Sequence, residues 1–192
     1  SSLVDYKIKI ICPQKGIRKK LINNSSQNAE VSLNRKISEE DKTVKNFDEI
    51  KKIFKITNNI NRIEVYDNSH IQGKFAVGAM IVANKDGFDK NSYRKYNLEI
   101  EGSSLGGNDF GMMEEVIKRR FRKNNSNLSS YNLPNLILID GGRGHLNTVY
   151  KVLKEYQLDW IKVCAISKGA DRNAGRERFH LIDENSFTLK PN

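Results

Sequence analysis

The hydrophobic positions change their period along the chain, and this change separates predicted strands from predicted helices. In the middle of the chain, apolar residues alternate with polar ones or form short runs, which is typical of strands. A turn signal at Lys85-Asp86-Gly87 divides two of these runs. Strands are expected over residues 62–67, 76–84 and 92–98. Because sequential strands with short connections pair with one another, they predict an antiparallel meander.

From residue 109 onward, segments with helical spacing alternate with short apolar runs. A helix is expected after an N-cap at Asn108 or Asp109, with apolar positions at Phe110, Met113, Ile117 and Phe121. The run Leu136–Asp140 is apolar up to its last residue, as expected of a buried parallel strand. A second helix then presents Leu146, Val149, Leu153 and Tyr156. A last strand over residues 162–167 and a hairpin over 179–182 and 187–189 complete the pattern.

The N-terminal third has a different pattern. Residues 1–11 alternate and predict a strand. Residues 17–37 have roughly helical spacing, but the polar run NNSSQN predicts an interruption, and residues 47–54 predict a short amphipathic helix. Residues 57–61 resemble a linker. We therefore expect a strand and helical appendage over residues 1–60 and the main domain over residues 61–192.

The order of elements in the main domain predicts an α/β fold: a ribonuclease H-like mixed five-stranded sheet flanked by helices. In such a fold the first and fourth strands lie parallel and adjacent, and sites form at the carboxyl ends of strands where the sheet order reverses. Asp67 ends the first strand and Asp140 the fourth. Asp109, in the first turn of the intervening helix, is expected to reach the same edge.

These three aspartates suggest a divalent-metal site. A carboxylate at the end of a buried strand is costly to desolvate unless it is paired, hydrogen-bonded or metal-bound. Hard oxygen ligands suit Mg²⁺ or Mn²⁺, and such ions support phosphodiester hydrolysis. The alternative is that Asp109 and Asp140 only cap the helices near them.

Composition and charge narrow the class of partner. The chain has 192 residues, with 33 basic and 23 acidic ones, and its net charge of +10 favours an anionic partner such as nucleic acid. No apolar run approaches the ~20 residues that a membrane span needs, so no membrane partner is expected. Cys12 and Cys164 are far apart and lack metal-ligand spacing, which suggests reduced thiols in a cytoplasmic protein.

Several long blocks resemble the endonuclease half of the UvrC family, the dual-incision subunit of bacterial nucleotide excision repair. These blocks are CPQKG, VYDNSHIQG, VGAMIVANKDGFDKNSYRKYN, NDFGMMEEVIKRRF, LILIDGGRGHLNTV and KGADRNAGRE. The resemblance implies a ribonuclease H-like domain that cuts damaged double-stranded DNA on the 5′ side of the lesion with a divalent metal. It also implies a UvrB-type partner for the full-length protein.

The family's metal-site aspartates match Asp67 in YDNSH, Asp109 in NDFGMM and Asp140 in LIDGG. His70 is expected to hydrogen-bond near this site. The family also has an essential histidine in a motif that would follow FTLKPN, and a C-terminal DNA-binding module of helix-hairpin-helix type. Because neither is in the sequence, the domain is expected to be C-terminally incomplete and weakly active or inactive alone.

Basic residues follow the central strands at the same edge as the aspartates. We expect phosphates flanking the scissile bond to contact some of them, although a solvated basic loop is the alternative. They are Arg143, Lys168, Arg172 and Arg176.

Two other functions of the chain stay open: a non-catalytic nucleic-acid-binding or scaffold module, and a different ribonuclease H-like nuclease.

Overall fold

The chain divides into two compact units, residues 1–42 and residues 43–192. The structure is a computed structural model that describes residues 11–71, 75–98, 109–122, 132–169, 177–182 and 184–189. The strand predicted at the N-terminus lies outside the described residues, apart from Ile11, which belongs to no element.

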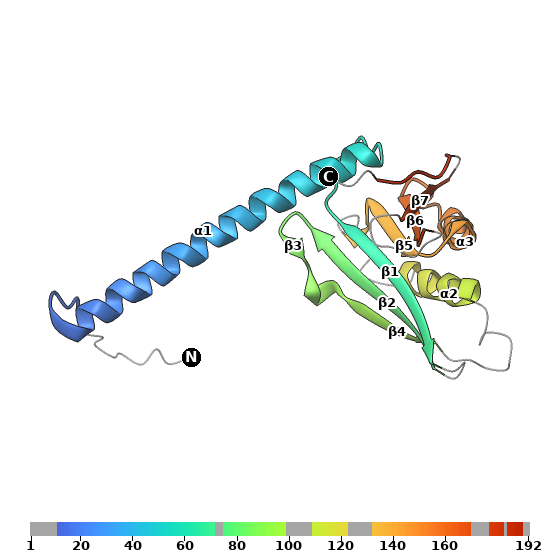
Figure 1. Ribbon diagram of the computed structural model, residues 1–192. Helices are drawn as coiled ribbons and strands as arrows, with labels where there is room; N and C mark the ends of the chain where they lie inside the picture. The colour runs from blue at the N-terminus through green and yellow to red at the C-terminus, as the bar shows by residue number, and fades with distance from the viewer. Residues whose placement is uncertain are drawn as a thin grey trace. The chain divides into compact units, whose positions relative to one another are not determined.

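One long helix occupies most of the first unit and continues into the second. This helix, α1, runs without a break from Gly16 to Ile53 (Figure 1). The interruption predicted at NNSSQN is therefore wrong. Asparagine, serine and glutamine lower helix propensity only modestly, and neither proline nor glycine occurs between Ile17 and Ile53.

A mixed sheet of seven strands forms the centre of the second unit, counted over the described residues. Its order is β3-β2-β1-β5-β6-β7, and β4 also pairs with β2 (Figure 1). The strands on one side are β1 Ile63–Ile71, β2 Phe75–Asn84, β3 Gly87–Phe88 and β4 Arg94–Leu98, with a 3-10 helix, η1, at Lys90–Ser92. The others are β5 Leu136–Asp140, β6 Lys162–Ser167 and β7 Arg178–Leu181.

The pairing confirms the predicted α/β topology. β1 and β2 are antiparallel, and β1 and β5 are parallel neighbours, with Ile63 opposite Leu136. The predicted count of five strands is too low for two reasons. The two-residue β3 was not predicted, because so short a strand carries almost no period-two signal. The strand β7 overlaps the hairpin segment predicted at 179–182, and it joins the main sheet by pairing with β6. Of the predicted C-terminal hairpin, one isolated bridge joins Phe179 to Phe187.

Two helices cover one face of the sheet, α2 at Asp109–Phe121 and α3 at Arg143–Glu155 (Figure 1). Their buried side chains pack against strand residues such as Tyr66 and Ile139. Most of the predicted apolar positions are buried, but Phe110 is 48% exposed. It stands in the first turn of α2, where its ring contacts the start of α3 rather than the sheet.

The other face of the sheet packs against a smaller cluster. This cluster includes Phe47 and Phe54, the latter just after the end of α1, together with Ile63 and Leu136. Along β1, Glu64 and Tyr66 therefore point to the α2 face, while Ile63 and Val65 point to the opposite face. Side chains alternate along a strand, so β1 assigns a face to each residue that follows.

Candidate active site

Asp67 and Asp140 lie side by side where the parallel pairing of β1 with β5 ends. Beyond Asp67, β1 continues to Ile71 in its pairing with β2, so the prediction that Asp67 ends the first strand is wrong. Tyr66 pairs with Ile139 in the β1–β5 ladder, and the two aspartates are the next residue of each strand. Neighbouring strands are about 4.8 Å apart, and the alternation of side chains puts both carboxylates on the face opposite α2. Both residues are exposed. The parallel pairing thus creates the carboxylate pair that the sequence pattern predicted.

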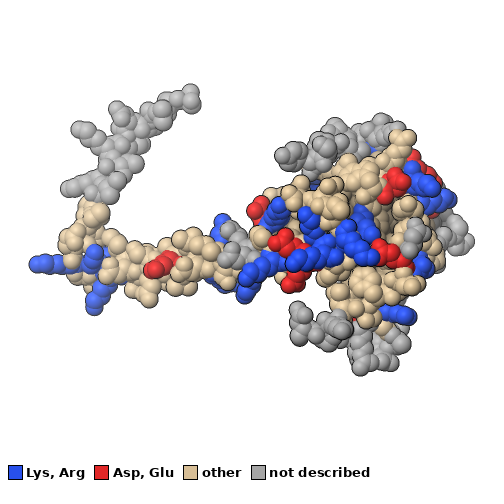
Figure 2. Space-filling view, turned by 90° about the horizontal axis from the view of Figure 1, so that it is seen from above, with Lys and Arg blue, Asp and Glu red and all other residues tan. Residues whose placement is uncertain are grey.

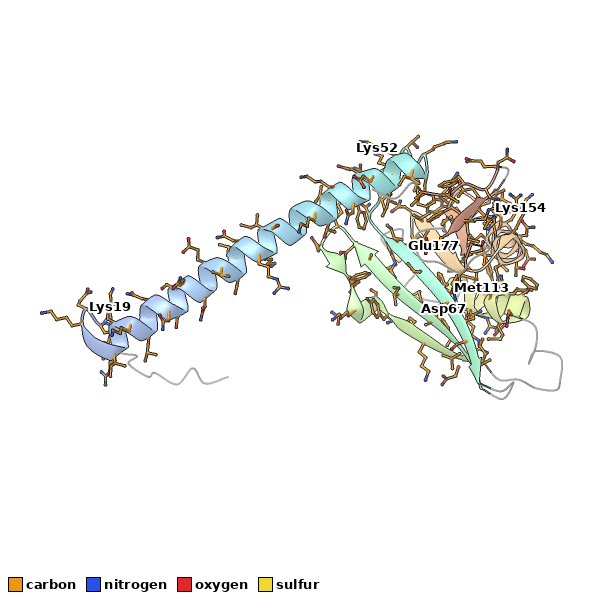
Figure 3. The ribbon with its side chains drawn as sticks, viewed as in Figure 1. Lys19, Lys52, Asp67, Met113, Lys154 and Glu177 are labelled. Atoms are coloured by element: carbon orange, nitrogen blue, oxygen red, sulfur yellow. The ribbon has the colours of Figure 1, made fainter. Side chains whose placement is uncertain are left out.

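The residue that follows Asp67 attaches β1 to α2 by a polar contact. With its amide oriented to satisfy its neighbours, Asn68 accepts a hydrogen bond from the backbone N–H of Met113 at 3.0 Å and donates to the Asp67 carbonyl at 3.2 Å. Figure 3 shows Asp67 on β1 beside Met113 on α2. A side chain at Gly78, opposite Asn68, would place its Cβ 2.4 Å from Val116 Cγ2. Glycine therefore permits the close approach of β2 and α2 beside the site.

Asp109 stands where the first turns of two helices meet. It is the first residue of α2 and is exposed. The ring of the next residue, Phe110, lies 4.6 Å from the ring of His145, centroid to centroid. A Cβ on Gly144 would meet the Phe110 ring at 2.5 Å. The first turn of α2 thus packs on the first turn of α3, which closely follows Asp140.

The turn between β5 and α3 depends on Gly141. Its φ of +156° lies within the range that favours glycine, and a Cβ there would lie 2.6 Å from His145 Nδ1. The imidazole of His145 lies over Gly141, because the empty space beside a glycine admits it.

The helix-cap alternative for Asp140 is excluded. The N-cap of α3 is Gly142, and no side chain makes a capping hydrogen bond there. In the described part of the chain, no group of three or more His, Cys, Asp and Glu side chains is arranged to hold a metal ion. Two adjacent exposed carboxylates still fit Mg²⁺, which proteins often bind through one or two carboxylates together with substrate phosphates and water.

Two of the four predicted phosphate-contacting residues lie within the described chain. Arg143 opens α3 and is exposed, and its Nη2 donates to the Glu184 carbonyl at 3.1 Å. Lys168 is exposed and directly follows β6. Arg172, Arg176 and the side chain of His70 lie outside what the structure describes. Figure 2 shows Lys and Arg side chains gathered on one face of the second unit, with Asp and Glu among them.

His180 lies near this edge, although no sequence motif pointed to it. Its Nε2 is 2.8 Å from Ser167 Oγ at the end of β6, and its Nδ1 is 2.8 Å from Ser186 Oγ. Burial lowers the pKa of His180, and the charges of Arg143 and Arg178 lower it further. The His180 imidazole therefore connects the end of β6 to Ser186, two residues after the Glu184 carbonyl that accepts from Arg143.

The two cysteines lie in different environments. Cys12 is exposed and Cys164 is buried, and both thiols are free. Burial raises the pKa of Cys164 to about 12, so this thiol stays protonated and unreactive at neutral pH. Among the described residues, no helix has the length and apolar character to cross a membrane.

The central parallel pair of strands, the antiparallel strands beside it and the aspartates at its carboxyl edge define a ribonuclease H-like α/β domain. The chain belongs to the UvrC RNAse H endonuclease domain family, whose family model matches residues 51–192. The resemblance noted in the sequence is thereby confirmed.

Curated relatives agree with this assignment. UvrABC system protein C of Zymomonas mobilis is 44% identical over 195 residues, covering 100% of this chain and 29% of the relative. The protein of the same name from Bartonella henselae is 46% identical over 201 residues, covering 96% of this chain and 30% of the relative. The chain thus spans about 30% of these relatives. Among solved structures, human ENDOV matches 57% of this chain and 46% of its own, at 14% identity and a TM-score of 0.41.

Proposed function

We propose that this domain is a divalent-metal-dependent DNA endonuclease that makes the 5′ incision in nucleotide excision repair. The adjacency of Asp67 and Asp140 on parallel strands carries the proposal, because it puts two oxygen ligands at one exposed point of the sheet edge. Membership of the UvrC endonuclease family supports the choice of substrate. The proposed full-length context is damaged double-stranded DNA and a UvrB-type partner, as in the UvrABC system that names the relatives.

In this proposal Asp67 and Asp140 hold Mg²⁺ or Mn²⁺, and Asp109 assists from the first turn of α2. The bound ion would supply charge compensation on the phosphate, an activated water and stabilisation of the leaving oxygen. The chain orients the ligands: the β1–β5 ladder fixes Asp140 beside Asp67, and the amide of Asn68, the residue after Asp67, fixes β1 on α2. Exposure leaves room for a phosphodiester to complete the coordination.

Metal-dependent DNA binding tests the proposal even if this chain cuts slowly on its own. Fluorescence anisotropy would measure duplex affinity with and without Mn²⁺ at constant ionic strength. We expect Mn²⁺ to tighten binding by the wild type, because it neutralises two carboxylates that repel phosphate. Asp140→Asn should lose the metal effect, whereas Asp86→Asn, in an exposed hairpin turn, should keep it. DNA binding that ignores the metal would favour the non-catalytic module instead.

The flanking basic residues have their own test. We propose that Arg143 and Lys168, together with Arg172 and Arg176, contact phosphates beside the scissile bond. Each released counterion contributes about 0.9 to the slope of log affinity against log salt. Arg143→Ala combined with Lys168→Ala should therefore lower DNA affinity and reduce that slope by about 2. An unchanged affinity and slope would mean that these residues form only a solvated basic loop.

A further inference from the structure

An arginine-lined cavity lies at the far end of β1 from Asp67. Its volume is about 470 Å³, and the guanidinium groups that line it belong to Arg62, Arg94, Arg119 and Arg120. Arg62 immediately precedes β1, Arg94 begins β4, and the other two lie in the last turn of α2. A strand rises about 3.3 Å per residue, so the five steps from Arg62 to Asp67 separate the cavity from the aspartate pair by about 17 Å.

The cavity carries more positive than negative charge. Its lining, as the structure describes it, contains no Asp or Glu. The buried carboxylate of Glu64 lies beneath it, where Oε1 accepts hydrogen bonds from Arg120 Nη2 at 2.8 Å and from Arg62 Nε at 2.7 Å. The single negative charge of Glu64 is therefore shared by two positively charged guanidinium groups. The hydroxyl of Tyr66 also donates to this carboxylate, at 2.7 Å.

The two outer arginines are held in place mainly by neutral or exposed groups. Arg94 Nη1 donates to the carbonyls of Asn91 and Tyr93, at 3.1 and 2.8 Å, and no carboxylate in the described chain pairs with it. Arg119 donates to the Asn97 carbonyl at 2.7 Å and to the partly exposed Glu115 at 2.6 Å. Their positions are thus set before any ligand arrives, which lowers the entropy lost on binding.

A cavity with this lining suits one class of ligand. Arginine presents a rigid fork of N–H donors that matches the oxygens of phosphate, and several forks around one space suit an anion that has several oxygens to accept from them. The volume lies within the roughly 300–1,000 Å³ of typical ligand pockets, so it has room for a phosphate with its sugar. Half-buried Tyr96 adds an aromatic surface to the lining.

We propose that this cavity binds a backbone phosphate of the nucleic acid, several nucleotides from the bond at the aspartate edge. It thereby provides a second anchoring point that fixes the direction of the strand across the domain. The inference rests on the proposed function only in taking nucleic acid as the ligand. The net charge of +10 and the Lys and Arg side chains gathered on one face of the second unit in Figure 2 support that choice over a small free anion.

Substitution of Arg94 tests the cavity with a matched control on the next residue. Both Arg94 and Lys95 are exposed on β4, and alternation turns Lys95 to the opposite face. Duplex affinity would be measured in EDTA, so that the result does not depend on a metal site. Arg94→Gln should weaken binding about fivefold and lower the salt slope by about 1, while Lys95→Gln should change affinity less than twofold. Arg94→Lys should restore only part of the loss.

Equal effects of Arg94→Gln and Lys95→Gln would overturn the proposal. Thermal unfolding of each variant would show that a loss of affinity does not reflect a loss of fold. Titration with inorganic phosphate and with dAMP separates the sources of the anion. If Arg94→Gln removes dAMP binding and leaves duplex affinity unchanged, the cavity serves a free nucleotide and the backbone assignment is wrong. Failure of the metal-dependent tests above leaves this result intact.

Discussion

At the scale of single residues, the exposure of Asp140 changes how its place at the end of an apolar strand is interpreted. It ends a strand whose other residues are apolar, which suggested a carboxylate that needs a partner to offset desolvation. In the structure both Asp140 and Asp67 are exposed, so water solvates each of them. At about 5 Å in water, two such charges repel by only ~0.8 kcal/mol. The repulsion between the two carboxylates therefore costs the fold little stability when no metal is bound.

Glu64 is the residue whose burial most constrains the chain. Its side chain is 0% exposed, and Arg62, Arg120 and Tyr66 surround it. Glu64→Gln would leave the buried Arg120 guanidinium without its counter-charge. We expect a loss of about 3–5 kcal/mol in the free energy of unfolding, measured by urea denaturation. Glu115→Gln, which breaks the partly exposed pair with Arg119, should cost less than about 1 kcal/mol.

Comparable losses for these two substitutions would contradict the account of the buried pair. A double-mutant cycle of Glu64 and Arg120 would then show whether the two side chains interact at all, because such a cycle isolates the pairwise energy. The expected coupling is at least about 1 kcal/mol, as for residues in one buried network.

His180 predicts a pH dependence of stability. Its pKa in the folded protein lies below the ordinary value of 6.5, because of burial and the charges of Arg143 and Arg178. As the pH falls through about 6.5, the unfolded chain takes up a proton that the folded chain resists. The contribution of this residue therefore falls with decreasing pH. His180→Gln should flatten the thermal stability profile between pH 7 and pH 5, relative to the wild type.

NMR titration of the ring provides the direct measurement. We expect the His180 pKa to lie below 6.5, and Arg143→Gln should raise it by removing one of the two nearby positive charges. A wild-type pKa at or above the ordinary value would show that the imidazole is solvated or paired with an acid.

At the scale of elements, the clearest signals in the sequence came from the longer segments. The helices α2 and α3 and the strands β1, β2 and β5 follow from their apolar spacing, and their order predicted the parallel pair that carries Asp67 and Asp140. The two-residue β3 and the continuity of α1 through NNSSQN did not, because one is too short to show a period and the other depends on modest differences in propensity.

Only part of the candidate site could likewise be predicted from the sequence. Topology predicted which strand ends meet, but contacts across the fold determine the rest. The ring of His145 over Gly141, the Asn68 bridge to α2 and the arginines that share Glu64 join residues far apart or oriented by a turn. No spacing rule for a single segment carries this information.

The close contact between β2 and α2 gives a prediction at this scale. A Cβ at Gly78 would meet Val116 Cγ2 at 2.4 Å and the side-chain amide of Asn68 at 3.0 Å. Gly78→Ala should therefore push the helix from the strand and cost about 1–3 kcal/mol, measured by chemical denaturation. Gly142→Ala is the matched control, since no atom lies within 4 Å of its Cβ. Equal stability of the two variants would show that β2 and α2 are packed more loosely.

At the scale of the whole domain, charge and topology act together. In the proposed function, the chain's net charge of +10 would attract nucleic acid to a sheet edge that carries two carboxylates. Those carboxylates would oppose phosphate unless a cation lay between them. The arginine cavity and the residues after β5 and β6 would then hold the strand at two separated points. In this account the metal completes the DNA-binding surface as well as the chemistry.

The most direct measurement is calorimetric titration of Mn²⁺ into the wild-type chain, Asp140→Asn and the control Asp86→Asn. The account predicts a saturable binding event in the wild type and in Asp86→Asn that Asp140→Asn loses or weakens at least tenfold. Binding that is unchanged in Asp140→Asn, or absent from the wild type both alone and with duplex DNA, would contradict a metal site at the carboxyl edge of β1 and β5.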